Sequence, residues 1–171
     1  MTQRQFPSFD ETSAPLAARE ALLRTKRAFG AVPAPVARYA SSPVMLSLAL
    51  SGLEAFEKGS LAPLEREVLA MTMGHRNGCN FCLALHRRML TAQHAPSQLV
   101  SELEAGQALS EPRLEALRRF VLAVLDERGD VSLAVWNEFR EAGYSHEQAL
   151  DVLAGISVYT LTTLTNRLVE V

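Results

Sequence analysis

The chain has 171 residues, 48% of them hydrophobic, which is enough for one sizeable core and too little for two independent ones. Seventeen basic and nineteen acidic residues give a net charge of −2, and no block of like charges occurs. This balance speaks against a nucleic-acid partner. Small molecules and proteins are the partners that we expect.

Two segments bear on where the protein works. Residues 1–12 include Arg4, Asp10 and Glu11 and lack the apolar region of a secretory signal, so we expect a cytoplasmic protein. Residues 149–164 are apolar almost throughout, but the run is shorter than the roughly 20 residues that a bilayer requires, and Asp151 interrupts it. We therefore expect no membrane contact, and a helix buried in the core or between subunits.

Helical periodicity recurs along the chain and no segment alternates like a strand, so the predicted fold is an all-α helical bundle. We expect one helical domain over residues 13–171. An N-terminal arm over residues 1–12 precedes it and either lies on a neighbouring subunit or frays. In chain order, the expected helices run from Ser13 to about Gly30, from Ser42 to Gly59, from Pro63 to Asn77, from Cys79 onward, from Ser110 to about Gly129, from Val131 to Gly143, and from Ser145 onward.

Two of these boundaries have the clearest signals. Asn77-Gly78 suits the left-handed turn that closes a helix. Ser145 and Gln148 form a Ser-x-x-Gln capping box, in which each side chain satisfies a free backbone donor of the other residue. The second expected helix has two apolar sides and should be buried on both. One face of the first expected helix should be buried through Ala18, Leu22, Thr25 and Phe29.

The only two cysteines, Cys79 and Cys82, stand three residues apart, and His86 follows four residues later. A Cys-x-x-Cys pair can close a small disulfide ring, and the histidine lies on the same helical face as Cys82, near enough to exchange a proton with it. At the start of a helix, free N–H groups and the positive dipole end should stabilise a Cys79 thiolate. In a reducing compartment the pair indicates redox chemistry rather than a structural disulfide.

A lowered thiol pKa is by itself a weak source of catalysis. Lowering it by about two units raises the thiolate fraction at pH 7 roughly 25-fold, but reduced nucleophilicity leaves a net gain of only about 3-fold. A general acid that protonates a departing alkoxide contributes roughly 10²- to 10⁴-fold, so the site needs an acid.

His86 and Glu67 are the candidates for that acid. If the helices on either side of the Asn77-Gly78 turn are antiparallel, the two residues lie at similar levels, about 12 Å and 15 Å from the turn. A carboxylate paired with an imidazole fixes the tautomer of the ring and can pass protons to Cys82.

These residues, with Glu67, the Asn77-Gly78 turn, Cys79-x-x-Cys82 and His86 in this order, resemble the AhpD-like peroxidases of the carboxymuconolactone decarboxylase superfamily. The resemblance is close over residues 67–86, and the helical organisation of the remaining chain is compatible with it. It implies an all-helical subunit that forms a homo-oligomer, a trimer or hexamer, and an enzyme that reduces organic hydroperoxides.

The resemblance also implies a role for each residue. Cys82 is expected to be the peroxidatic cysteine that becomes a sulfenic acid, and Cys79 the more exposed partner that resolves it to a disulfide. Glu67 and His86 are expected to form the proton relay. A dithiol or lipoyl-type protein would reduce the disulfide again, and no metal or cofactor is implied. Phe81 stands where AhpD itself has a histidine, so one proton carrier is missing here.

Other interpretations of the same residues stay open. The thiols can be buried apolar groups, His86 a core histidine, and Glu67 part of a solvated face in the charged run Glu65-Arg66-Glu67. Alternative functions are a ring-lactone decarboxylase that does not need the thiols, and a non-enzymatic redox sensor or metal-binding module. A zinc site would draw its two nitrogens and two sulfurs from His75, Cys79, Cys82 and His86.

Overall fold

The structure, a computed structural model, describes residues 5–171, and this part of the chain is helical with no strand. This confirms the all-α fold class. No helix in the same part is long and apolar enough to cross a membrane. The helices are α1 Leu16–Phe29, α2 Ala34–Tyr39, α3 Pro43–Glu57, α4 Pro63–Arg76, α5 Asn80–Ala92, α6 Ser97–Ala105, α7 Pro112–Asp126, α8 Leu133–Glu141 and α9 His146–Leu168.

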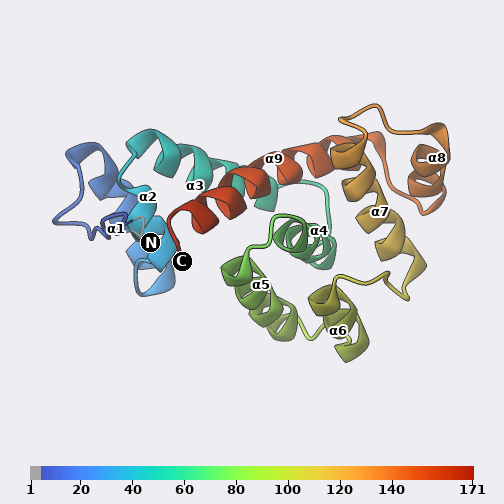
Figure 1. Ribbon diagram of the computed structural model, residues 1–171, viewed down its shortest axis with the longest axis horizontal. Coiled ribbons are helices and arrows are strands. Elements are labelled where there is room, and N and C mark those ends of the chain that lie inside the picture. Colours follow the sequence, from blue (N-terminus) through green and yellow to red (C-terminus); the bar gives the residue numbers. More distant parts are fainter. Residues whose placement is uncertain (1–4) are drawn as a thin grey trace.

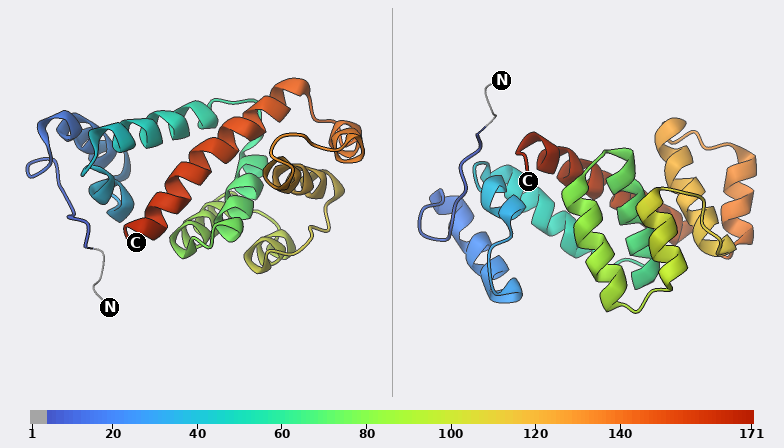
Figure 2. Two further views of the ribbon diagram at one scale, coloured as in Figure 1. Left: turned by 45° about the horizontal axis from the view of Figure 1, so that its top comes forward. Right: turned by 60° about the horizontal axis from the view of Figure 1, so that its bottom comes forward.

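The long helix α9 organises the molecule. It runs through the middle, with α1 and α2 at one end and α7 and α8 at the other (Figure 1). Helices α3 and α4 both pack along α9, and α5 packs on α4 (Figure 2). Helix α4 also contacts α6 and α7, so it is enclosed by four other helices.

Helix α4 begins at Pro63, as expected, and its residues 67–74 are buried without interruption. Glu65 and Glu67 are only 5% and 6% exposed, so the alternative interpretation that Glu67 is part of a solvated helix face is wrong. Buried carboxylates need hydrogen-bonding or charged partners. Arg113 is the partner of Glu65, and His86 is the partner of Glu67.

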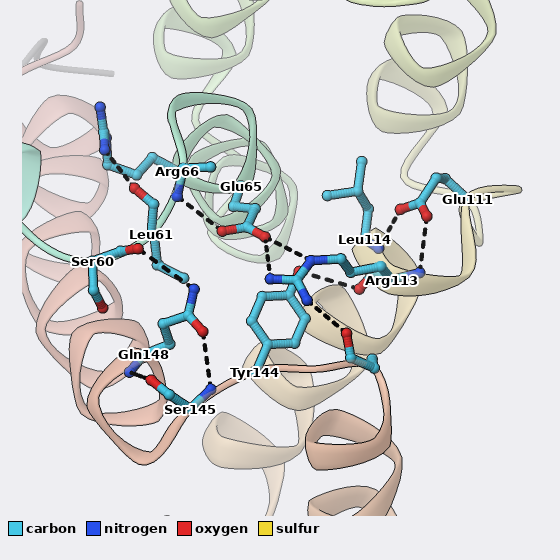
Figure 3. Close-up of polar contacts among 12 residues, drawn as sticks. Ser60, Leu61, Glu65, Arg66, Glu111, Arg113, Leu114, Tyr144, Ser145 and Gln148 are labelled. Atoms are coloured by element: carbon cyan, nitrogen blue, oxygen red, sulfur yellow. Dashed lines mark hydrogen bonds and ion pairs between the residues drawn. The ribbon is translucent and has the colours of Figure 1, made fainter.

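Glu65 anchors the start of α4 (Figure 3). Its Oε1 accepts hydrogen bonds from Nε and Nη2 of Arg113 at 3.0 Å and 2.9 Å, while Oε2 accepts one from the Ala62 N–H at 2.8 Å. The Arg113 guanidinium lies 4.0 Å from the centre of the Tyr144 ring. This cluster joins α4 to α7 and to the segment before α9, which fixes the axis on which Glu67 is placed.

The predicted capping box at the start of α9 is confirmed (Figure 3). Ser145 Oγ accepts a hydrogen bond from the Gln148 N–H at 3.0 Å, and Gln148 Oε1 accepts one from the Ser145 N–H at 2.9 Å. Helix α9 therefore begins where the local sequence places it.

Two helices were not among those expected. Helix α2 has six residues and is flanked and interrupted by Pro33 and Pro35, and α6 has nine residues and follows Pro96. Both are too short for apolar periodicity to stand out from the flanking segments. Helix α7 has Glu111, not Ser110, as its N-cap, because the Glu111 carboxylate accepts the free N–H groups of the first turn.

Some faces expected to be buried are exposed in the single chain. Phe29 is 71% exposed at the end of α1, although Ala18, Leu22 and Thr25 are buried. The prediction that α3 is buried on two sides is wrong for the single chain, because Val44 and Leu48 are 70% and 58% exposed. Helix α9 likewise presents exposed leucines, namely Leu150, Leu153, Leu164 and Leu168.

The predicted N-terminal arm is covered only in part, since residues 1–4 lie outside the described residues. Phe9 packs against a buried cluster formed by α1, α2 and α3, and its N–H donates to the Ala37 carbonyl at 3.0 Å. The segment around Phe9 thus packs against helices of its own subunit. Contact of the arm with a neighbouring subunit stays a prediction.

Candidate functional site

A tight turn brings α4 and α5 together. Gly78 has a φ of +62°, the left-handed conformation that glycine adopts without a Cβ penalty. A Cβ on Gly74 would lie 3.0 Å from Leu83 Cδ2 and 3.7 Å from Cys82 Cβ, so a glycine lets the two helices approach closely. The turn leaves Cys79 as the N-cap of α5.

Glu67 and His86 meet across these two helices. Glu67 Oε2 and His86 Nδ1 are 2.8 Å apart, and both side chains are 7% exposed. Because an ionised carboxylate only accepts, Nδ1 carries the hydrogen of this bond and Nε2 is left on the opposite side of the ring for a further proton contact. Gln93 donates to Oε1 of Glu67 at 3.4 Å, and the Tyr159 ring makes an edge contact with the imidazole at a centroid distance of 5.3 Å.

The two cysteines are reduced and buried one turn apart. Cys79 is 2% exposed and Cys82 is 5% exposed, so both are buried and the greater exposure predicted for Cys79 is not seen in the single chain. As the N-cap, Cys79 has its sulfur directed at the first turn of α5, and the Cys82 N–H donates to Cys79 Sγ at 3.4 Å. His86 follows Cys82 by one helical turn.

The surroundings of the two thiols shift their pKa values in opposite directions. The pKa of Cys79 falls from 9.0 to about 6, chiefly because the Cys82 thiol donates to it, with help from the Cys82 N–H and Asn166 and against the effect of burial. The pKa of Cys82 is raised because its hydrogen is engaged by Cys79 and because it is buried. The pair therefore holds one negative charge first, on Cys79, as the helix N-terminus predicts.

Two residues that sequence reasoning missed complete the surroundings of the sulfurs. Asn166, on α9, points its Nδ2 at Cys82 Sγ (3.3 Å) and Cys79 Sγ (3.8 Å). Tyr39, at the end of α2, donates its hydroxyl hydrogen to Asn166 Oδ1. In the sequence, Asn166 is only a polar residue that follows the apolar run of residues 149–164. Nothing in the sequence links it to cysteines more than 80 residues earlier.

His75 does not join the site. Its ring lies against Gly106 at the end of α6, beside a cavity of about 110 Å³ that Thr72 and Leu103 help to line. Within residues 5–171, no three His, Cys, Asp or Glu side chains are grouped as metal ligands. The four residues considered for a zinc site therefore do not converge.

Comparison with known proteins gives the family and the fold class of this chain. Residues 43–127, about half of the chain, match the Carboxymuconolactone decarboxylase family. The matched segment contains Glu67, both cysteines and His86. No curated protein matches the chain by sequence.

Solved structures of similar fold extend the likeness over nearly the whole chain. A protein from Ralstonia eutropha JMP134, described as an alkylhydroperoxidase AhpD core and uncharacterized peroxidase-related protein, has a TM-score of 0.81 at 23% identity, covering 95% of this chain and 88% of that one. An uncharacterized peroxidase-related protein from Silicibacter sp. TM1040 has a TM-score of 0.78 at 18% identity, covering 99% and 93%. The debrominase Bmp8 has a TM-score of 0.77 at 17% identity, covering 98% and 91%.

The fold is thus that of the AhpD-like helical proteins. The chain belongs to the carboxymuconolactone decarboxylase family, and its fold is AhpD-like. Membership of this family supports an enzymatic role.

Proposed function

We propose that the protein is a thiol-dependent peroxidase that reduces organic hydroperoxides through a redox-active Cys79/Cys82 disulfide. The observation that carries this proposal is the buried 2.8 Å contact between Glu67 and His86, one helical turn from Cys82. A carboxylate-oriented imidazole beside a thiol pair provides both parts that the chemistry needs, a nucleophile and a proton donor.

The reaction balances with these groups. A thiolate attacks one peroxide oxygen, so that an S–O bond forms and the O–O bond breaks, and the departing alkoxide takes a proton through His86 and leaves as an alcohol. The second cysteine attacks the resulting sulfenic acid, an S–S bond forms, and hydroxide leaves as water after protonation. One hydroperoxide and two thiols thus give one alcohol, one water and the disulfide.

The superfamily resemblance makes Cys82 the peroxidatic cysteine and Cys79 the resolving one. The lowered pKa of Cys79 means that the charge resides there at rest. The Cys82 thiol is already hydrogen-bonded to Cys79. Transfer of its proton to Cys79 places the negative charge on Cys82 for the attack. His86 and Glu67 then supply the proton for the leaving group.

An external dithiol, either a small molecule or a lipoyl-type protein, closes the cycle by thiol–disulfide exchange. A cytoplasmic location fits this cycle, because a reducing compartment returns the pair to the dithiol form. The proposed working form is a homo-oligomer, a trimer or hexamer, and the apolar residues exposed on α3 and α9 are consistent with such an assembly.

Steady-state kinetics with cumene hydroperoxide and excess dihydrolipoamide test the proposal. We expect the wild-type protein to consume peroxide over many turnovers, a Cys82→Ser variant to fall to the background rate, and a Cys79→Ser variant to stop after about one oxidation per subunit. Full turnover by Cys82→Ser would contradict the proposed mechanism.

A ring-lactone decarboxylase is the second candidate, because the matched family bears that name and the Glu67–His86 pair can perform acid–base chemistry without sulfur. The two functions differ in their need for the thiols. Lactone turnover that survives alkylation of both cysteines, in a protein that consumes no peroxide, would establish the second candidate over the first.

A further inference from the structure

The amide of Asn166 lies between the thiol pair and Tyr39. Its nitrogen is 3.3 Å from Cys82 Sγ and 3.8 Å from Cys79 Sγ, so its two N–H groups offer one donor to each sulfur. Asn166 and Tyr39 are 4% and 5% exposed. Water therefore competes little for these hydrogen bonds, and a buried donor has a strong effect on a neighbouring charge.

The Tyr39 hydroxyl determines which end of the amide faces the sulfurs. Burial raises the pKa of Tyr39, so the hydroxyl keeps its hydrogen and donates it to Asn166 Oδ1. A reversed amide would direct its oxygen at Cys82 and would repel a thiolate. The hydroxyl also lies 3.3 Å from the Thr162 carbonyl oxygen, which can accept its hydrogen if the amide is removed.

We propose that Asn166, oriented by Tyr39, is a catalytic residue that donates hydrogen bonds to both sulfurs and stabilises the thiolate of the pair. Its part in turnover rests on the proposed peroxidase function, whereas its effect on thiol ionisation does not. Neither residue lies in the segment that matches the family, residues 43–127. They come from α9 and α2, outside that segment, and the Asn166 side chain reaches the two sulfurs at the start of α5.

Other groups also act on the thiols, and the experiment must hold them constant. The nearest positive group on α9 is Arg167, which donates to the Asn77 carbonyl at 2.8 Å. The titratable side chains around the pair come from four helices: Tyr39 on α2, Glu67 on α4, His86 on α5 and Tyr159 on α9. A substitution at Asn166 replaces none of these side chains, and only Tyr39 loses a hydrogen-bond partner, for which the Thr162 carbonyl is the substitute.

The test is a pH titration of thiolate absorbance at 240 nm in the reduced protein, between pH 5 and 8.5, with the doubly alkylated protein as the blank. An Asn166→Leu variant keeps the side-chain volume but has no donor. We expect its first thiol midpoint to rise by about one pH unit, a tenfold loss in the ionisation constant, because a hydrogen bond to the charged form favours that form.

A second variant keeps the test decisive if Asn166→Leu does not fold. Tyr39→Phe removes only the hydroxyl that holds the amide, and we expect a smaller rise of the midpoint in the same direction. Tyr144→Phe is its control, since it removes another buried hydroxyl, bonded to the Arg113 carbonyl and far from the sulfurs. Asn77→Ala is the control for Asn166→Leu, because Asn77 also bonds to α9, through Thr163, without touching a sulfur.

Midpoints that rise in Asn166→Leu and Tyr39→Phe and stay unchanged in both controls would support the inference. Curves of Asn166→Leu and Tyr39→Phe that superimpose on the wild type would overturn it. Peroxide consumption is measured separately on the wild-type protein. A raised midpoint together with an inactive wild type would refute the peroxidase function and would leave Asn166 established as the thiolate donor.

Discussion

At the scale of single residues, the charge on Cys79 follows from position. Being the N-cap of α5 gives its sulfur the Cys82 N–H and the positive end of the helix, and the sequence predicts this from Gly78 alone. The size of the decrease in the pKa of Cys79 also depends on Cys82 and Asn166, which lie beside the Cys79 sulfur in the folded chain. The sequence therefore indicates the sign of the shift but not its full cause.

Ionisation of Cys79 should make the reduced protein more stable as the pH rises from 6 to 8.5. Because the pKa of Cys79 is about 6 in the folded protein and 9.0 ordinarily, the charged form favours folding. The contribution of Cys79 to the free energy of unfolding is complete only at a pH above its pKa in the unfolded chain, and it disappears as the pH falls through 6. Urea unfolding at several pH values, under reducing conditions, measures it.

A Cys79→Ser variant is the control for this pH dependence, because its hydroxyl does not ionise in this range. The difference in unfolding free energy between the wild type and the variant should grow with pH over the window. A constant difference would show that Cys79 has no lowered pKa. Measurements stop below pH 9, since the raised pKa of Cys82 would act in the opposite direction at higher pH.

Replacing the relay carboxylate should slow peroxide reduction strongly. Glu67→Gln keeps an acceptor for His86 Nδ1 but removes the charge that stabilises a protonated ring, so we expect a loss of about 10²-fold or more in peroxidase rate. Gln93→Ala is the control, since it removes only the 3.4 Å contact to the other carboxylate oxygen, and should change the rate by less than about 3-fold. A Glu67→Gln variant with the wild-type rate would exclude the relay.

At the scale of elements, local sequence signals predicted where helices begin and end better than they predicted which helix faces are buried. Pro63, the Gly78 turn and the Ser145 capping box lie where the structure has them, because each acts through its own backbone. The short helices α2 and α6 were missed. The burial of each face of α1 and α3 depends on partners distant in sequence. Phe29 was therefore predicted to be buried, whereas it is exposed.

The cluster that anchors α4 should contribute measurably to stability. Arg113→Ala leaves the buried carboxylate of Glu65 without its guanidinium partner, and we expect a loss of about 1–3 kcal/mol in unfolding free energy, kept modest because Arg113 is 38% exposed. Urea unfolding at fixed protein concentration provides the measurement.

Another arginine of α7 provides the matched control. Arg119 pairs with Glu138 on the surface, and both side chains are more than a third exposed, so Arg119→Ala should cost about 0–1 kcal/mol. Equal losses for Arg113→Ala and Arg119→Ala would mean that the Glu65 cluster does not anchor α4.

At the scale of the whole molecule, α9 is apolar on more faces than one chain covers. Its exposed leucines at positions 150, 153, 164 and 168, and those of α3, are typical of a surface that a further subunit covers. We therefore expect an oligomer by size-exclusion chromatography with light scattering, and the resemblance to AhpD-like peroxidases implies that it is a trimer or hexamer. A protein that stays monomeric at micromolar concentration would contradict the predicted assembly.

The central claim is that Cys79 and Cys82 reduce a hydroperoxide as one unit. Free thiols are counted before and after one equivalent of cumene hydroperoxide per subunit, and the oxidised species is identified by mass spectrometry. The account predicts a fall from two thiols to none, with a Cys79–Cys82 disulfide, a mass loss of about two hydrogens, and one equivalent of alcohol. Two thiols that remain free, with the peroxide unconsumed, would contradict it.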